Sequence, residues 1–377
     1  MQKKYLLAPG PTPVPDQALR AMAEPMWHHR TPRFRNLYKE VTEGLQEVIQ
    51  TSQNVYCIGS SGTGAMEAAI VNLIDTGRKT VVVRGGKFGE RWGAICQAYG
   101  IEFLPIDVTW GEAADPAEVA RVAKSDPAVA AVCLTLCETS TGTHTDVKAV
   151  CDALTDSGVL VFVDGISSVG ACEFRMDDWG VDATIVGSQK ALMTPPGLAY
   201  IALSQRADAA METCCRGRFY LDLRAYKKSL PKWDPPYTPP VTLFAAQHES
   251  LKMMRDFGIQ NIWQRTADFG KATRAALQAM GLALLSKAPS DCVTAVCLPD
   301  DVDGNEVVAH MRDVQGVTPA GGQAQLKGKI VRLTHMGHID KFDILVGLTA
   351  LAQALAAQNH TVDLGKGVNT FVKLLGE

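Results

Sequence analysis

The chain has 377 residues and a formal net charge of -3, from 37 basic and 40 acidic side chains. At roughly 150 residues per domain, this length predicts enough core for two to three domains. Apolar residues make up 46% and charged residues 20%, which excludes a disordered chain. The weak net charge argues against nucleic acid or a membrane surface as a partner and favours small ligands.

The sequence shows no signal for secretion or membrane insertion. The apolar stretch after Tyr5 is interrupted at once by Pro9, Gly10 and Pro11, and no run approaches the ~18 apolar residues of a spanning helix. Ten cysteines are scattered along the chain without a CxxC pair. We therefore expect reduced, buried thiols, no metal site and a cytoplasmic location.

The first two thirds of the chain alternate between helix-like and strand-like patterns. Apolar side chains at three- and four-residue steps from Phe34 to Ile49 predict a helix with one buried face. Short apolar runs then predict strands at Thr80–Arg84, Glu102–Ile106, Val129–Thr135, Val159–Val163, Ala183–Val186 and Ala199–Leu203. Because these runs lack polar alternation, they indicate a mainly parallel sheet covered by helices on both faces, in an α/β domain.

The pattern changes after the last of these strands. Residues Arg216–Pro240 are aromatic, basic and proline-rich, which predicts an ordered loop or a linker. Later elements are predicted as a helix over 243–280 with a break at Gly258, strands at Val293–Leu298 and Ile330–Thr334, and helices at Glu306–Val314 and Lys341–Ala356. We therefore expect an N-terminal arm (1–15), a large α/β domain (16–257) and a small α+β domain (258–377).

Small residues connect a strand-like run to a helical segment near position 60. The turn Ser60–Gly64 follows Val55–Ile58 and precedes the helical Ala65–Leu73. Free N–H groups at a helix N-terminus suit a phosphate, and small residues permit its close approach. The turn lacks the GK[ST] ending of a nucleotide-binding P-loop, so it is either another kind of phosphate cradle or a tight structural turn.

Two charged residues follow later strand-like runs. Asp164 comes directly after Val159–Val163, where a poorly solvated carboxylate either pairs with a metal, a substrate amine or a protonated ring nitrogen, or caps the next segment. Lys190 follows Ala183–Val186 and is either a solvated loop lysine or a partly desolvated amine that attacks aldehydes. Ligands of parallel sheets bind beyond the carboxyl ends of the strands, where both residues are expected.

A phosphate cradle, an acid and a lysine match the three chemical handles of pyridoxal phosphate (PLP). The chain also carries the motifs LLAPGPTPVP, SGTGAME, GGKFGER, CETSTGT, VDGISSVG, GSQKAL with PPG, PYTPPV and KIVRLTHMG. From about Leu6 to Leu355 it thereby resembles the class V aminotransferases of the fold-type I PLP superfamily, which include alanine:glyoxylate and serine:pyruvate aminotransferases. The resemblance implies the α/β fold of the fold-type I PLP enzymes, with a mainly parallel sheet in a large PLP-binding domain and a smaller C-terminal α+β domain.

The resemblance also implies a role for each matching residue. Lys190 matches the lysine that binds the cofactor covalently, Asp164 the acid that pairs with the ring nitrogen, and Arg332 the arginine that binds the substrate carboxylate. The other implied cofactor contacts are Ser61, Gly62, Thr63, Ser188 and Gln189 at the phosphate, Phe88 and Ile166 on the faces of the ring, Thr139 near the ring's 3-oxygen, and Tyr237 and Thr238 at a neighbouring subunit's phosphate. The last contact implies a homodimer with shared active sites.

The implied reaction is transamination from a small amino acid, alanine or serine, to glyoxylate or pyruvate by a ping-pong mechanism. One alternative is a 2-aminoethylphosphonate:pyruvate transaminase, for which Arg30, Arg33 and Lys87 would form a second anion site. Another is a cysteine desulfurase, which needs an exposed loop thiol that we do not expect from Cys214, Cys215, Cys292 or Cys297. A non-catalytic protein that has kept the fold is a further alternative.

Four histidines belong to segments that the resemblance places near the active site. His28 and His29 are interpreted as polar residues of the active-site mouth or of an interface. His335 and His338 either line the substrate pocket or belong to a solvated turn around Gly337.

Overall fold

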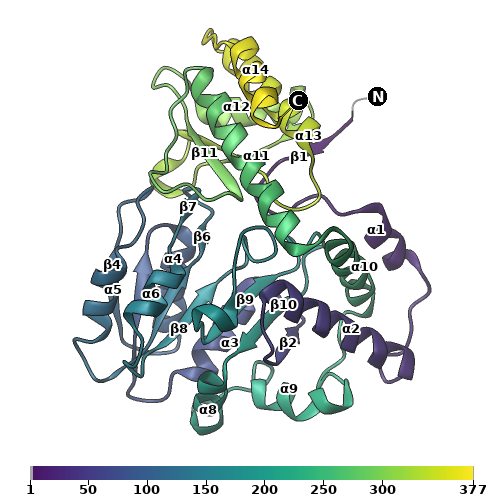
Figure 1. Ribbon diagram of the computed structural model, residues 1–377, viewed down its shortest axis with the longest axis vertical. Helices are drawn as coiled ribbons and strands as arrows, with labels where there is room; N and C mark the ends of the chain where they lie inside the picture. Colours follow the sequence, from purple (N-terminus) through teal and green to yellow (C-terminus); the bar gives the residue numbers. More distant parts are fainter. Residues whose placement is uncertain (1–2, 377) are drawn as a thin grey trace.

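A seven-stranded sheet forms the centre of the larger body, which is the lower part of Figure 1. The structure, a computed structural model, describes residues 3–376. The strand order is β2–β10–β9–β8–β5–β3–β4, with bounds β2 Val55–Ile58, β3 Lys79–Arg84, β4 Phe103–Asp107, β5 Val129–Thr135, β8 Leu160–Asp164, β9 Ala183–Gly187 and β10 Ala199–Leu203. Neighbours from β9 to β4 are parallel, whereas β10 is antiparallel to β9 and β2. The predicted mainly parallel sheet is confirmed.

Helices pack around this sheet. They are α1 Asp16–Ala23, α2 Pro32–Ile49, α3 Gly62–Leu73, α4 Lys87–Ala98, α5 Pro116–Ala123, α6 Val147–Ala153, α7 Met176–Trp179, α8 Gln205–Thr213 and α10 Val241–Phe257. In α2, Thr31 caps the helix by accepting a hydrogen bond from Phe34 N, and Pro32 occupies the first turn. The predicted apolar stripe from Phe34 to Ile49 is buried, so α2 is stabilised mainly by packing.

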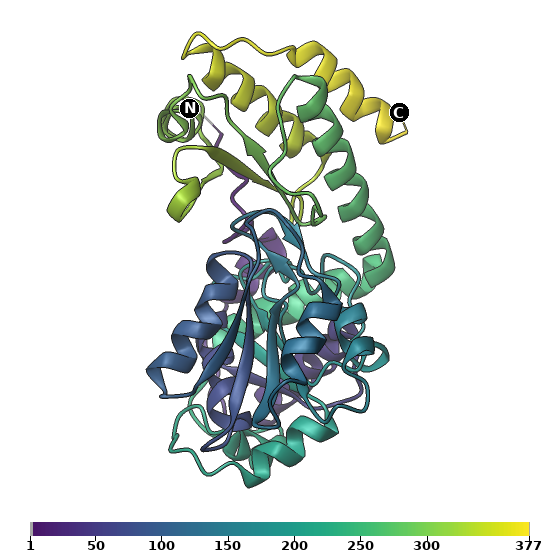
Figure 2. The same ribbon diagram turned by 90° about the vertical axis from the view of Figure 1, so that its left-hand side faces the viewer.

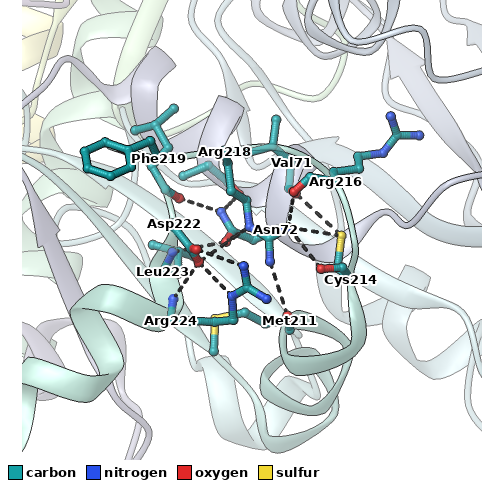
Figure 3. A network of polar contacts seen from close by, with 12 residues as sticks. Val71, Asn72, Met211, Cys214, Arg216, Arg218, Phe219, Asp222, Leu223 and Arg224 are labelled. Atoms are coloured by element: carbon teal, nitrogen blue, oxygen red, sulfur yellow. Dashed lines mark hydrogen bonds and ion pairs between the residues drawn. The ribbon is translucent and has the colours of Figure 1, made fainter.

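The segment Arg216–Pro240 is ordered but is more than the loop that its composition predicts. It contains the helices α9 (Leu223–Ser229) and η1 (Leu230–Lys232). The Arg218 side chain is 1% exposed, donates to Asn72 Oδ1 at 2.7 Å from Nε, and binds the carbonyls of Cys214 and Arg216. Figure 3 shows how this guanidinium ties the segment to α3. The local sequence pattern does not predict α9, because Asn72 of the distant helix α3 holds this region in place through its bond with Arg218.

The smaller body lies above the large sheet, and the long helix α11 (Ile259–Ala279) joins the two (Figures 1 and 2). Its other elements are β11 Val293–Cys297, α12 Gly304–Ala309, the π-helix η2 His310–Val314, β12 Val317–Thr318, β13 Ala320–Gly321, η3 Ala324–Leu326, β14 Ile330–Thr334, α13 Lys341–Ala356 and α14 Leu364–Leu374. An antiparallel sheet has the order β11–β14–β13. The predicted break at Gly258 is confirmed, since this glycine has a φ of 88° between α10 and α11.

The N-terminal arm joins the smaller body. Its strand β1 (Tyr5–Leu6) pairs in parallel with β12, and Leu7 belongs to the hydrophobic cluster formed by α11, α13, α14 and β14. A separate cluster runs from Phe34 to Ile262 in the larger body. The division of the chain at 257/258 stays a prediction.

The carboxyl ends of the parallel strands face the smaller body. The short strands β6 (Cys137–Glu138) and β7 (Thr143–His144), which follow β5, lie at this edge beneath β11 in Figure 1. Within residues 3–376, no helix is long and apolar enough to cross a membrane. The same residues contain no group of three or more His, Cys, Asp or Glu side chains arranged to hold a metal ion.

Candidate active site

Lys190 lies three residues beyond the end of β9, and its side chain contacts the N-terminal arm. Its side-chain nitrogen donates to Pro9 O at 2.6 Å and to Ser167 Oγ at 3.2 Å. The residue is 9% exposed, and burial lowers the pKa of its amine to about 8, against the attraction of Asp164. A measurable fraction of this amine is therefore uncharged near neutral pH and able to attack an aldehyde.

Asp164 is the last residue of β8, the strand next to β9. Its Oδ1 accepts a hydrogen bond from Ile166 N at 2.9 Å. Burial raises the pKa of this carboxyl to about 6, while the Ile166 bond and the charges of Lys190 and Arg91 oppose the rise. Its other oxygen has no hydrogen-bond partner in residues 3–376, so it can accept from a protonated ring nitrogen.

The turn before α3 forms a cradle of unsatisfied donors. Ser61 is the N-cap residue, but its exposed hydroxyl makes no capping bond, and the N–H groups of Gly62 and Thr63 donate to no described residue. A Cβ atom at Gly62 would lie 2.3 Å from Ile166 Cδ1, so only glycine lets the turn lie against that side chain. Free N–H groups beside a helix N-terminus suit a phosphate.

The helix α4 carries an aromatic ring and a cation toward the same place. The Phe88 ring centroid lies 5.7 Å from Lys190 Nζ and 4.9 Å from the Arg91 guanidinium carbon. Arg91 donates to the Thr63 hydroxyl at 3.2 Å and has no carboxylate partner in the described part of the chain. Phe88 is thus next to the lysine, and Arg91 adds positive charge to the cradle.

Arg332, on β14, reaches the site from the smaller body. Its Nε and Nη2 donate to Gly321 O at 3.0 and 2.8 Å, and its Nη1 donates to Thr139 O at 2.8 Å. These bonds use three of the five guanidinium N–H donors, which leaves two for a carboxylate. Burial lowers the pKa of Arg332 to about 10, so it stays charged at neutral pH.

A hydrogen-bond chain connects the arginine with the lysine. The Thr139 hydroxyl lies 2.6 Å from Ser167 Oγ, which accepts from Lys190 Nζ, while the Thr139 carbonyl accepts from Arg332. Sequence reasoning missed Ser167, although it stands in the motif VDGISSVG beside Asp164. Its position as the third residue after a strand-end acid is the signal that could have indicated it.

The N-terminal arm passes directly over Lys190. Thr12 donates from its N to Gln189 O at 3.0 Å and from its hydroxyl to Lys190 O at 2.7 Å. A Cβ atom at Gly10 would lie 2.3 Å from Lys190 Cε, and Gly10 has a φ of 126°. This close approach requires glycine.

The structure does not bring every predicted residue to the cradle. The Ser188 hydroxyl donates to Pro195 O at 2.8 Å and its N donates to Leu198 O, so this residue has no donor left for a phosphate. The half-buried Gln189 keeps its side-chain N–H donors free of described partners. Tyr237 donates to Phe219 O at 3.1 Å, and Thr238 is exposed without a hydrogen bond to any described residue.

The histidines serve structural or surface positions. His335 is fully buried, bonds to Asp291 O through Nδ1 at 2.9 Å, and has its pKa lowered to about 3 by burial, so it is part of neither a solvated turn nor an open pocket. His338 is exposed. His28 and His29 stack on each other in the loop before α2.

The family model for class V aminotransferases matches residues 4–330, which is most of the chain. The chain belongs to this family. The class V aminotransferases depend on PLP, so the chain is a PLP-dependent aminotransferase of fold type I, as the sequence predicts.

Curated relatives match along almost the whole chain. The "Soluble hydrogenase, small subunit" of Synechococcus sp. (strain PCC 6716) is 38% identical over 95% of this chain and 94% of its own length. The L-aspartate–glyoxylate aminotransferase of Paracoccus denitrificans is 35% identical (96% and 94%). The serine–glyoxylate aminotransferase of Methylorubrum extorquens is 34% identical (97% and 94%).

A solved aminotransferase structure has the same fold. The ureidoglycine–glyoxylate aminotransferase of Bacillus subtilis superposes with a TM-score of 0.95 at 27% identity, covering 100% of this chain and 99% of that one. The predicted fold class is therefore confirmed.

The donor set of this aminotransferase fits PLP. The free N–H groups and the Ser61 hydroxyl suit a phosphate, the unpaired oxygen of Asp164 suits a ring N–H, and the buried amine of Lys190 suits an aldehyde. The assignment of these residues to the individual parts of the cofactor stays a prediction.

Proposed function

We propose that the enzyme moves an amino group from a small neutral amino acid, alanine or serine, to glyoxylate or pyruvate. The observation that carries this proposal is the single anion site at Arg332, whose two remaining N–H donors match one carboxylate. Alanine, serine, glyoxylate and pyruvate each carry one carboxylate and no second anionic group.

A second anion site near Arg332 lacks support. Arg30 pairs with Asp234 at 2.7 Å, and Lys87 pairs with Glu90. The Arg33 guanidinium lies 3.5 Å from the centroid of the Trp27 ring. Because all three cations already have partners, they do not favour 2-aminoethylphosphonate as a substrate. The aspartate–glyoxylate relative makes aspartate the more informative competitor.

The desulfurase alternative also lacks a suitable thiol. Cys215 is exposed, contrary to our expectation, but its N donates to Asp75 just beyond the carboxyl end of α3. The cradle lies at the opposite end of this helix of 12 residues, about 18 Å away along the axis. A thiol at that distance is not placed to accept sulfur from a substrate held by Arg332.

The proposed roles of the residues follow from their contacts. PLP, when bound, supplies an aldehyde and an electron-withdrawing ring. Lys190 binds at the aldehyde and, once released, moves a proton at the substrate's alpha carbon. Asp164 keeps a proton on the ring nitrogen, Phe88 and Ile166 orient the ring, and Arg332 orients the substrate carboxylate. The amino donor reacts first and leaves as its keto acid, and the keto-acid acceptor then reacts at the same site. This order of events is a ping-pong cycle.

We also propose a homodimer. The exposed Thr238 hydroxyl is free to reach the cradle of a second subunit, and Phe219, which contacts the adjacent Tyr237, is 80% exposed. Exposed apolar side chains next to a functional loop are typical of an interface.

The test is a donor panel with a substrate-arginine variant. Alanine, serine, aspartate and 2-aminoethylphosphonate are each offered with glyoxylate or pyruvate, and the keto product is measured; we expect alanine or serine to give the highest kcat/KM. Arg332→Ala should cost on the order of 2 to 5 kcal/mol in kcat/KM, because the substrate carboxylate loses its partner. Arg312→Ala, at an exposed ion pair in the same body, is the control and should change kcat/KM less than twofold. A preference for aspartate or for the phosphonate would refute the single-anion site.

A further inference from the structure

Glu138 is a buried carboxylate that no role described above uses. It is the last residue of β6 and is 5% exposed. Its oxygens accept hydrogen bonds from the N–H groups of Phe88, Gly89 and Ser140, and from the Ser140 hydroxyl. No cation in residues 3–376 lies within ion-pair distance of it, so its hydrogen bonds come from backbone N–H groups and a hydroxyl.

The segment Glu138–Ser140 caps the first turn of α4. The N-cap residue of α4 is Gly86, which has no side chain to accept from the free N–H groups of the first turn. Lys87 N donates to Ser140 Oγ at 3.1 Å, and Phe88 N and Gly89 N donate to Glu138 Oε2 at 3.1 and 2.9 Å. A residue about 50 positions away thus replaces the local cap.

Glycine at position 86 makes this arrangement possible. A Cβ atom there would lie 2.4 Å from the Glu138 carboxyl carbon and 2.3 Å from Ser140 Oγ. The start of α4 therefore lies directly against the side chains of Glu138 and Ser140.

The same segment holds the substrate arginine and is linked to the lysine through Ser167. Thr139 O accepts from Arg332 Nη1, and the Thr139 hydroxyl bonds to Ser167, the acceptor of Lys190 Nζ. Phe88 on α4, Arg332 on β14 and Lys190 beyond β9 consequently share one support. The Glu138 charge also raises the pKa of Arg332 against the effect of burial.

We propose that Glu138 is a positioning residue, whose carboxylate fixes the start of α4 and the 138–140 segment and thereby sets Phe88 and Arg332 relative to Lys190. This inference rests on the proposed roles of Phe88 and Arg332. It predicts two separate effects: on the cofactor through Phe88, and on the donor substrate through Arg332.

The test compares two buried carboxylates. Glu138→Gln keeps the side-chain shape but turns one acceptor into an N–H donor that faces other donors. Asp182→Asn is the control, because Asp182 is also buried and accepts from Val161 N at 2.9 Å and Ser204 Oγ at 2.6 Å. It lies 3.6 Å from Arg206 Nη2 and directly precedes β9, whereas Lys190 follows the other end of that strand. Both variants are measured as PLP-loaded enzymes well below their melting temperatures.

We expect Glu138→Gln to raise the KM for the donor, to lower kcat/KM about 10- to 100-fold, and to reduce the visible circular dichroism of bound PLP. Asp182→Asn should lose thermal stability but keep kcat/KM and the dichroism within twofold. If Glu138→Gln loses only stability, as the control does, the proposal is wrong.

Two further measurements keep the outcome decisive. Ser140→Ala removes the acceptor of Lys87 N and should shift the same quantities in the same direction by a smaller factor, even if Glu138→Gln does not fold. The dichroism is recorded without substrate, so it reports on the proposal even if the donor assignment fails. If Phe88→Ala changes the dichroism and neither Glu138→Gln nor Ser140→Ala does, Phe88 keeps its role and Glu138 has none.

Discussion

Burial moves the pKa values of Lys190 and Asp164 toward each other. It lowers that of the amine to about 8 and raises that of the carboxyl to about 6, since both groups lose hydration of their charged forms. Their mutual attraction and the Ile166 bond oppose these shifts only in part. The site therefore holds an amine ready to react beside an acid that is still mostly ionised at neutral pH.

The lowered lysine pKa predicts how fast the PLP-free protein captures PLP. Only the uncharged amine attacks an aldehyde, so the rate of covalent capture, followed by visible absorbance, should rise with pH around a midpoint near 8. Lys148 is exposed, and its bond to Asp152 raises its pKa, so surface lysines of this kind should not contribute in this range. A midpoint near 10 would show that Lys190 is not desolvated.

The motifs indicated the residues that carry chemistry, but not those that support them. Lys190, Thr139 and Arg332 were predicted, and the structure connects them through Ser167, while the charge of the predicted Asp164 acts on Lys190. Glu138 is in the quoted motif CETSTGT, yet its importance depends on N–H groups about 50 residues away in sequence. Contacts of this kind exist only after folding and leave no local pattern.

At the scale of elements, the apolar pattern predicted the bounds of a helix or strand correctly where its apolar side chains are the ones that pack in the core. β5, β10, β14 and α13 have their predicted bounds. The short helix α9 was missed because Asn72 and Arg218 determine the course of its region, and α14 because its sequence contains two glycines and only a narrow apolar face. In the region of α9, long-range hydrogen bonds determine the structure more than the local helix propensity does.

The Arg218 network predicts a large loss of stability without loss of chemistry. Arg218→Met should lower the free energy of unfolding by about 3 to 5 kcal/mol, because Asn72 Oδ1 and two carbonyls lose a buried cationic donor. Arg224→Met removes an arginine that is 41% exposed and bound to Asp222, and should cost less than about 1 kcal/mol. Denaturant unfolding measures both; equal costs would show that the buried arginine is not a structural anchor.

At the scale of the whole molecule, the smaller body and the arm close the carboxyl edge of the large sheet. Arg332 enters from the smaller body and Pro9 from the arm, so neither body alone contains the complete site. The loop with Tyr237 and Thr238 lies outside this closure, beside the exposed Phe219. In the homodimer that we propose, this loop would serve the site of the second subunit.

The proposed dimer predicts that association and cofactor binding weaken together. The protein should sediment as a dimer with an interface of obligate size, upward of ~2,000 Å² in total. Phe219→Asp places a charge in the proposed interface and should lower both the dimer fraction and the affinity for PLP. Phe342→Asp, at an exposed aromatic residue of the smaller body, is the control. A wild-type monomer with full activity would refute the shared site.

The covalent attachment site of PLP tests the account most directly. The PLP-loaded protein is reduced with borohydride, digested and mapped by mass spectrometry, with Lys190→Ala treated in parallel. We predict a phosphopyridoxyl group on Lys190 in the wild type and none on a specific lysine of the variant. Among the lysines of residues 3–376, Lys190 alone combines burial, a lowered pKa and electrostatic interaction with both Asp164 and Arg332. A label on Lys87 or another lysine, or no label at all, would contradict the account.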